Sequence, residues 1–446
     1  SSSRPSRPPW AKPPRDGPVA SVRRTRRRPE RDRPLTAAPS AAIAGGIVRP
    51  AVVYALLFGA VCAYVPYISI FLGSTGLDLG TVGALIALHA AVSLVAAPGW
   101  GALADGIGDV RGPILAAGVL SAISAVLRAL SVGPLSLALA MALLAAATAG
   151  IIPLVDSRAV RMAGQRERFG RGRAWGSAAF VVVAFAAGAA LGPFGPGGMF
   201  LLYAPLLVAT GLAAWSLLRL PTDGDAASRP QRRAGFGRVA GMALAGLSPT
   251  TILAVLRRPQ LGAFFVASAL IWLSHAALQG FVSLRIVDLG GDATVVAATW
   301  SLGALVEVPL MYTFPALARR FGAERLVVIG ALAFGLRALV SALAPDPALI
   351  VAASLSGGVG FAFVYLGTVS WVAGVVPREV QATAQGIFTG TAVSLGAIGG
   401  SILGGAIGGA LGLPVLFGLA AAGYVAGGVL VWIAVVRGAG PRRMPA

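Results

Sequence analysis

Two opposite charges lie deep inside apolar sequence in the second half of the chain. Glu307 precedes Arg319 by twelve residues, and Arg319 begins a short basic turn. Arg337 follows Arg325, at the end of that turn, by twelve residues as well. If the flanking stretches are helices, a rise of about 1.5 Å per residue puts both charges roughly 18 Å from the same end, level on adjacent antiparallel helices. The spacing predicts a functional site, with a structural ion pair between two helices as the alternative.

The composition of the chain indicates the environment of these charges. Of 446 residues, 57% are hydrophobic and 12% are charged. The mean hydropathy is +0.81, and soluble domains carry about twice this fraction of charge. We therefore predict a polytopic membrane protein. The net charge of +20 arises mainly from an N-terminal stretch and from short loops, which is a pattern of membrane topology and not of a nucleic-acid-binding face.

Several kinds of chemistry find no support in the sequence. Cys62 is the single cysteine, so an intramolecular disulfide is impossible. We find no metal-ligand spacing, no phosphate-binding loop and no arrangement of catalytic side chains in the loops. The sequence therefore predicts a protein that is not an enzyme and has neither a metal site nor a cofactor.

Apolar segments long enough to cross a bilayer follow one another from residue 50 onward. We place twelve at 51–73, 79–103, 113–133, 134–157, 173–192, 199–220, 260–287, 294–318, 326–344, 348–376, 383–411 and 414–436. Alternate connections contain arginine, at 104–112, 158–172, 221–258, 319–325 and 377–382. The remaining connections, 74–78, 131–134, 192–198, 288–293, 345–347 and 411–414, contain no Lys or Arg. By the positive-inside rule, both termini are expected in the cytoplasm.

The predicted fold is an all-α membrane protein of twelve helices in two six-helix halves. Residues 1–48 are rich in Pro, Arg and Ser, which favours a disordered basic cytoplasmic tail, with an organellar transit peptide as the alternative. A cytoplasmic linker at 221–258 separates the halves 49–220 and 259–438, and a cytoplasmic tail follows at 439–446. A weak repeat supports the division: Ala-Leu-Ala, Gly and Arg at 102–104, 108 and 111 recur at constant offset at 316–318, 322 and 325.

The loop GALADGIGDVR carries the first resemblance to a known family. It resembles the signature loop of the major facilitator superfamily, with Gly101, Asp105, Gly108 and Arg111 at matching positions. Gly106 stands where the family usually has a basic residue, so the family's gating charge pair does not transfer directly. The resemblance implies that this loop takes part in conformational change, and that two parallel halves move around a site near the membrane midplane.

Four further motifs resemble the proton-coupled branch that contains the phenylpropionate and lactose permeases, and they are most similar to the phenylpropionate type. They are PLVDSRA from Pro153, FGRGRAWGSAAF from Phe169, SHAALQGF from Ser274 and WSLGALVE from Trp300. That branch frames its substrate with residues that match Asp156 and Arg173. It also carries a His, a Glu and an Arg that match His275, Glu307 and Arg337. The segment 348–376 lacks the ionisable pair of the lactose type, which makes a sugar substrate less favoured.

Other polar residues in the apolar segments have a structural and a functional interpretation. His275 and Gln279 share a helical face, and we favour a polar pathway over simple packing. The aromatic residues Tyr54, Tyr64, Tyr67, Trp272 and Trp300 line a substrate path or anchor the helix ends. Packing or a hydrogen bond between helices is favoured for His89, and close helix packing for the glycines at 396, 400, 404, 408 and 412. Arg128 is expected to reach toward a membrane surface and is given no mechanistic role.

The sequence and the resemblance together predict a secondary active transporter that moves a small organic solute by alternating access. Proton-coupled symport of an organic acid or similar compound is the preferred mode, with Glu307, His275 and Arg337 in the proton pathway. The alternatives are a proton-driven exporter of hydrophobic compounds and a non-transporting membrane sensor or scaffold. The expected partners are a small-molecule substrate, protons and the lipid bilayer, with no nucleic acid. We expect a monomer that spans the inner (plasma) membrane many times.

Overall fold

The structure of the chain is a computed structural model that describes residues 40–131, 133–163, 166–219, 259–376, 385 and 388–437. The predicted linker 221–258, the tail 439–446 and most of the tail 1–48 lie outside these residues. Residues Ile43–Ala446 form one unit, and Ser1–Ala42 form a separate one. Every regular element within the described residues is helical, which confirms the predicted all-α class.

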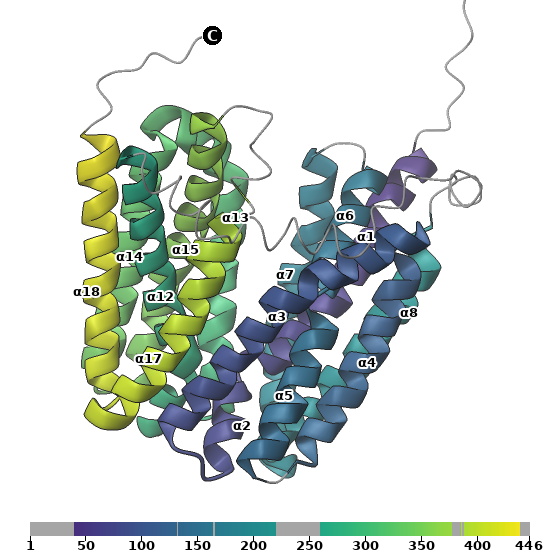
Figure 1. Ribbon diagram of the computed structural model, residues 1–446, viewed down its shortest axis with the longest axis horizontal. Helices are drawn as coiled ribbons and strands as arrows, with labels where there is room; N and C mark the ends of the chain where they lie inside the picture. Colours follow the sequence, from purple (N-terminus) through teal and green to yellow (C-terminus); the bar gives the residue numbers. More distant parts are fainter. Residues whose placement is uncertain are drawn as a thin grey trace, which may run out of the picture. The chain divides into compact units, whose positions relative to one another are not determined.

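The helices before the predicted linker, called here the N-terminal helices, contain several interruptions. They are α1 (Ser40–Tyr64), α2 (Ile68–Ser74), α3 (Leu79–Ile107), α4 (Arg111–Ala129), α5 (Pro134–Thr148), α6 (Ile151–Ala163), α7 (Arg166–Phe194), the 3-10 helix η1 (Pro196–Met199) and α8 (Phe200–Leu217). Figure 1 shows α4, α5 and α8 packed side by side, with the oblique α3 in front of them.

The helices after the predicted linker, called the C-terminal helices, are longer and more continuous. They are α12 (Pro259–Asp288), α13 (Ala293–Phe321), α14 (Ala323–Leu343), α15 (Pro347–Val375), the π-helix η3 (Thr389–Leu395), α17 (Gly396–Leu411), α18 (Leu413–Val431) and the π-helix η4 (Trp432–Val436). Within the described part of the chain, 12 helical spans are long and apolar enough to cross a membrane. Each of these spans overlaps one of the segments expected from the sequence, which confirms their number.

Prolines explain where two of the spans are interrupted. Proline removes a backbone donor, and its ring crowds the carbonyl four residues earlier. The helical chain breaks between Tyr64 and Ile68, around Pro66. A second break, at residues 149–150, lies just four residues before Pro153 and separates α5 from α6. Asp156 therefore lies on a separate helix, α6, and not on a continuation of α5.

The internal repeat is stronger in the backbone than in the sequence. Helices α3 and α13 begin and end at the same offset, and both contain 29 residues. Each is preceded by a capping aspartate whose side chain accepts hydrogen bonds from backbone N–H groups of the first turn. Each is also flanked by two glycines with positive φ, a backbone conformation that costs other residues strain. The paired residues are Gly76 and Gly290, Asp78 and Asp292, and Gly108 and Gly322.

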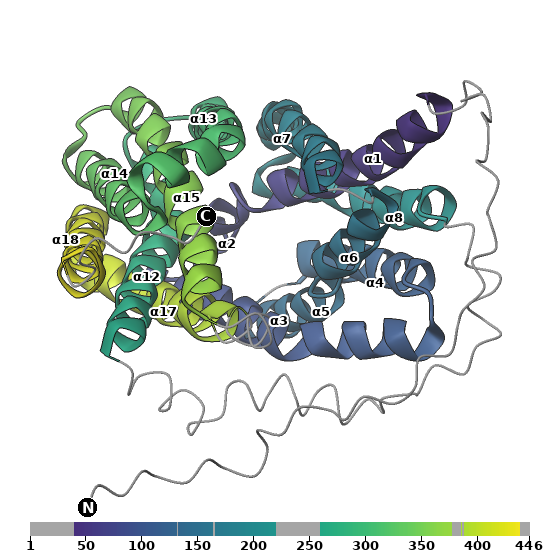
Figure 2. The ribbon, with the colours of Figure 1, turned by 90° about the horizontal axis from the view of Figure 1, so that it is seen from above.

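The N-terminal and C-terminal helices meet closely at the ends whose connections lack Lys and Arg, called here the arginine-poor end. Helix α3 packs on α17, and α7 packs on α13 (Figures 1 and 2). A Cβ atom on Gly405 would overlap the carbonyl oxygen of Leu79 and lie 3.0 Å from Cα of Gly83. On the other pair, a Cβ on Gly188 would lie 2.9 Å from the carbonyl oxygen of Ala293. Glycine therefore permits both backbone contacts.

The glycine series of α17 packs this helix on two neighbours at once. A Cβ on Gly396 would lie 3.0 Å from the backbone nitrogen of Leu273, and one on Gly404 would lie 3.3 Å from Cα of Ala277. Both neighbours belong to α12, whereas Gly405 faces α3. The predicted close packing is therefore confirmed for Gly396 and Gly404, whereas Gly412 instead ends α17 with a φ of 88°. Helix α17 lies between α12 and α3.

Enlarging the contact between α3 and α17 should destabilise the fold. In Gly405→Ala the new methyl group would meet backbone atoms of Leu79, Gly80 and Gly83, none of which can rotate away. Overpacking of this kind costs about 1–3 kcal/mol. We expect a lower midpoint of thermal unfolding in detergent. The matched control is Gly418→Ala on α18, where nothing lies within 4 Å of the added atom. Equal midpoints for the two variants would contradict the contact.

Candidate functional site

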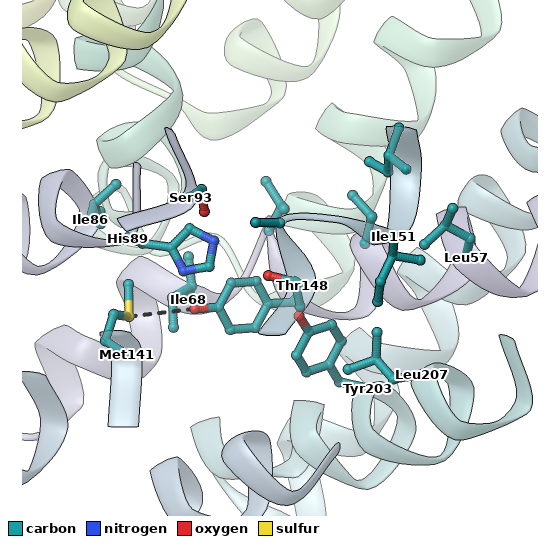
Figure 3. Close-up of a pocket in the computed structure, with 15 residues that line it drawn as sticks. Leu57, Ile68, Ile86, His89, Ser93, Met141, Thr148, Ile151, Tyr203 and Leu207 are labelled. Atoms are coloured by element: carbon teal, nitrogen blue, oxygen red, sulfur yellow. Dashed lines mark hydrogen bonds between the residues drawn. The ribbon is translucent and has the colours of Figure 1, made fainter. Parts of the chain in front are cut away.

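A cavity of about 400 Å³ lies among the N-terminal helices (Figure 3). Its lining is mostly apolar, with polar groups supplied by Tyr64, His89, Ser93, Thr148 and Tyr203. The rings of Tyr64 and Tyr203 stack with centroids 4.7 Å apart. The Tyr64 hydroxyl donates to Sδ of Met141 over 3.6 Å. A small solute could thus contact aromatic faces and a few hydrogen-bonding groups in the same space.

The carboxylate of Asp156 is held inside the N-terminal helices. The hydroxyl of Tyr54 on α1 donates to Oδ1 of Asp156 on α6 over 2.6 Å. Tyr54 is fully buried, so Asp156 does not lie on an exposed cytoplasmic edge, where counting along an unbroken helix would put it. Arg173 lies on α7, but its side chain is outside the described part of the structure. The predicted pairing of Asp156 with Arg173 stays a prediction.

Glu307 and Arg337 lie on opposite neighbours of one helix. Helix α15 packs against both α13, which carries Glu307, and α14, which carries Arg337. A Cβ on Gly357 would lie 2.8 Å from Nη1 of Arg337, and one on Gly358 would lie 3.2 Å from the backbone nitrogen of Glu307. Consecutive glycines of α15 therefore put the two residues at one level, as the sequence spacing predicts.

The two charges do not pair directly in this structure. Arg337 is 6% exposed, its Nε has no hydrogen-bond partner, and it forms no ion pair with Glu307 among the described residues. The expectation of direct neighbours is wrong because α15 lies between the two helices. The two helices are joined by a short turn but diverge, and each packs more extensively against α15 than against the other. Spacing along the chain gave the level of the charges but not their separation.

His275 lies in an aromatic cluster beside Arg337. Its Nδ1 is 3.3 Å from the hydroxyl of Tyr424, and its ring centroid is 4.8 Å from that of Phe334 and 5.3 Å from that of Trp272. Phe334 and Arg337 are one helical turn apart on α14, so Arg337 lies on the same face of α14 as the ring that His275 contacts. The structure thus brings together two of the three C-terminal residues predicted for the proton pathway.

The remaining C-terminal candidates differ in how firmly they are held. Trp300 donates from Nε1 to Oγ of Ser283 over 3.3 Å, which ties α13 to α12. Gln279 has a buried Oε1 without a hydrogen-bond partner in the described residues. An unsatisfied buried acceptor is costly unless a ligand or water reaches it. Gln279 is therefore the better candidate of the two for contact with a solute.

The interruption of the first span sends its tyrosines in different directions. Tyr64 lines the cavity, whereas the buried hydroxyl of Tyr67 donates to the carbonyl of Ala184 over 2.8 Å and lies 3.3 Å from that of Ala293. A spacing of three residues would put Tyr64 and Tyr67 on one face of an unbroken helix, but the chain turns at Pro66 between them and this face is not shared. Tyr67 bridges α7 and α13 and does not line the cavity.

The comparisons with known proteins agree with this arrangement. The model of the MFS_1 like family matches residues 47–418. The chain belongs to this family. A relative within the major facilitator superfamily, the maltose permease of Geobacillus stearothermophilus, is 27% identical over 357 residues, which cover 78% of this chain and 86% of that protein. The predicted superfamily is confirmed.

Solved structures of two transporters have the same fold as this member of the MFS_1 like family. The nucleoside transporter NupG matches with a TM-score of 0.72 and 17% identity over 87% of this chain and 98% of that one. The peptide transporter POT in complex with sulfate matches with a TM-score of 0.64 and 16% identity over 91% and 96% of the two chains. The protein is thus a transporter of the major facilitator type, and its relatives named here are transporters and not enzymes.

In the signature loop, the predicted residue Arg111 forms a charge cluster with Asp109 and Arg158, which the sequence pattern did not indicate. Asp105 is exposed, and Asp109 instead accepts from Nε of Arg111 over 2.8 Å. Nη2 of Arg158 lies 3.9 Å from Asp109, and its Nε donates to the carbonyl of Leu218 over 2.8 Å. The cluster joins the α3–α4 loop, α6 and the end of α8. Arg158 stands in the PLVDSRA motif, which was the available signal.

Two loop glycines have different local roles. Gly108 ends α3 with a φ of 78°, which explains why the loop has glycine at this position. Gly101 lies within α3, and nothing approaches the position of an added Cβ within 4 Å. The structure therefore gives Gly101 no packing role among the described residues, and its part in conformational change stays a prediction.

Arg128 is the clearest correction to the sequence analysis. The residue was expected to reach toward a membrane surface, but its side chain is completely buried. The reason is its direction: the guanidinium lies over the rings of Tyr64 and Phe71, at 6.0 and 5.5 Å from their centroids. It therefore points into the N-terminal helices, close to the cavity, and not toward lipid or water.

A methyl group on α15 should disturb Arg337 without disturbing the helix. In Gly357→Ala the new atom would lie 2.7 Å from Cδ of Arg337, so the guanidinium must move. A lost hydrogen bond to a charged group costs about 1.5–3 kcal/mol, which predicts roughly ten- to a hundredfold weaker solute binding if Arg337 contacts solute. Gly374→Ala on the same helix, with nothing within 4 Å, is the matched control. Equal uptake into vesicles by the two variants would contradict a role for Arg337.

Proposed function

We propose that the protein is a proton-coupled symporter of a small organic solute, with an organic acid or similar compound as substrate. One observation supports this proposal: Glu307 and the buried Arg337 lie at one level on either side of α15, and the ring of His275 contacts Phe334, one turn before Arg337 on α14. Charged groups at such depth in an apolar helix bundle are expensive and mark ion or solute pathways.

Glu307 is the proposed proton carrier. Of the described carboxylates, only Glu307 and Asp156 lie well away from a helix end, and Asp156 accepts a hydrogen bond from Tyr54. Protonation would neutralise Glu307 and change its attraction to nearby positive charge, so the proton would favour one conformation over the other. His275 is the proposed second member of the pathway, because an imidazole exchanges protons near neutral pH.

An anionic solute suits the charges that the structure describes. Arg337 is buried and has no ion-pair partner within the described residues, so a carboxylate on the solute would supply a countercharge. The similar proteins named above transport maltose, nucleosides and peptides according to their names. Their diversity supports a small-solute transporter and leaves the choice of solute to the side chains of this chain.

The apolar lining of the N-terminal cavity favours a second candidate function. Aliphatic and aromatic side chains dominate its wall, and a site of this kind suits a hydrophobic compound. The second candidate is therefore a proton-driven exporter of hydrophobic compounds. Deletion of the gene for such an exporter would make cells sensitive to these compounds, whereas deletion of the gene for a symporter would abolish uptake of one solute.

The substitution Glu307→Gln tests proton coupling directly. The amide has nearly the shape of a protonated carboxyl group but cannot release a proton. We expect solute to exchange across the vesicle membrane at close to the wild-type rate, while a pH gradient no longer drives accumulation. The assay uses reconstituted vesicles and the solute that a thermal-shift screen of organic acids, nucleosides and sugars identifies.

The matched control for this experiment is Glu324→Gln. Glu324 is the same residue type but lies in the first turn of α14, outside the membrane core. We expect pH-driven accumulation to persist in this variant. If Glu307→Gln also retains accumulation driven by a pH gradient, the coupling role of Glu307 is wrong.

A further inference from the structure

Arg128 presents a buried positive charge for which the structure supplies no countercharge. Its side chain is 0% exposed, and Nε and Nη2 have no hydrogen-bond partner. Nη1 contacts Sδ of Met141. Within the part of the chain that the structure describes, Arg128 forms no ion pair. The side chain is therefore held by aromatic faces and a thioether, which offset only part of the cost of burying a guanidinium.

Several described carboxylates accept hydrogen bonds from other groups. At the arginine-poor end, where α4 terminates, Asp78, Asp292 and Asp346 cap the helices that follow them by accepting bonds from backbone N–H groups. Deeper in the N-terminal helices, Asp156 accepts from Tyr54. A negative group for Arg128 must then come from outside these residues.

One layer of side chains, which forms part of the cavity wall, lies between Arg128 and the interior of the N-terminal cavity. Both Tyr64, whose ring lies under the guanidinium, and Met141, which contacts Nη1, line the cavity. Met141 is flexible, and its contact with the Tyr64 hydroxyl is a weak one. A change of the Met141 rotamer would expose two free donors of Arg128 to whatever occupies the cavity.

His89 adds a second unsatisfied group on the same wall. Its ring centroid lies 6.2 Å from that of Tyr64, and its buried Nδ1 has no partner. Figure 3 shows His89, Met141 and Tyr203 around one space. Two side chains with unpartnered buried nitrogens, beside a flexible methionine, are the features of a binding subsite, since buried polar atoms are otherwise satisfied.

We propose that Arg128 and His89 form an anion subsite at the cavity in the N-terminal helices. The ligand class is a small organic anion whose carboxylate binds the guanidinium and the imidazole while its body packs on the Tyr64 and Tyr203 rings. Arginine suits this task because its planar donors match a carboxylate. A cavity of about 400 Å³ accommodates a solute of this class. The inference rests on the proposed function as a solute transporter, and it adds a contact on the N-terminal helices.

A structural role for Arg128 predicts the opposite stability effect. If the guanidinium mainly held helices together, Arg128→Met would lower the unfolding midpoint of the ligand-free protein. If the charge awaits an anion, its replacement by an apolar side chain of similar length removes an uncompensated charge and leaves the midpoint unchanged or higher. The full chain in a neutral detergent is suitable for this measurement.

The binding test uses matched acids and amides as probes: benzoate with benzamide, nicotinate with nicotinamide, and acetate with acetamide. We expect the wild-type protein to be stabilised more by at least one acid than by its amide. Arg128→Gln should weaken binding of that acid at least tenfold and leave the amide unchanged. Arg128→Lys, which retains the charge, should bind with intermediate affinity, and His89→Phe should also weaken the acid.

Matched controls separate the possible failures. Arg285→Gln removes another arginine at the arginine-poor end, which donates to the carbonyl of Ala344, and should leave the preference for acid intact. The subsite is wrong if no acid is preferred over its amide, if Arg128→Gln keeps the preference, or if Arg128→Met lowers the ligand-free midpoint. Uptake of a solute that is insensitive to Arg128 would overturn the subsite alone. Acid binding without any uptake would overturn the proposed function alone.

Discussion

Burial of arginine inside an apolar helix bundle is the constraint on which this structure depends. Arg128, Arg158 and Arg337 are 0%, 2% and 6% exposed. Each guanidinium must be compensated locally, because the energy of a charge rises steeply as it leaves water. The three solutions differ: Arg158 uses a carbonyl and Asp109, Arg128 uses aromatic faces, and Arg337 uses space made by a glycine. Of the three, only Arg158 has both a hydrogen-bond acceptor and a countercharge within the described residues. The incomplete compensation of Arg128 and Arg337 fits the proposed anionic solute.

Much of the fold follows from local features of the amino-acid sequence. The apolar segments, the alternation of arginine between connections and the prolines at 66 and 153 determine the spans and their interruptions. These features are local, because the length of a helix and its breaks depend on neighbours in sequence. The backbone repeat also has a local cause, since capping aspartates and positive-φ glycines recur at one offset.

The candidate site was less predictable because it depends on which helices become neighbours. Counting placed Glu307 and Arg337 at one level, yet no count along the chain could show that α15 separates them. The position of Arg128 near the end of α4 follows from the sequence. The direction of its side chain does not, because it depends on Tyr64, Phe71 and Met141 from other helices. Residue types and levels follow from sequence, whereas partners follow from packing.

The repeat of α3 and α13 has a consequence for how chemistry is divided between the two copies. At the offset that matches their ends, Ser93 of α3 occupies the position of Glu307 in α13. Ser93 lines the N-terminal cavity and donates to the carbonyl of Ala145 over 3.4 Å. Two helices with one architecture thus present a neutral hydroxyl on one side and an ionisable acid on the other. The two helices thus share their ends and caps but differ in the side chain at this one equivalent position.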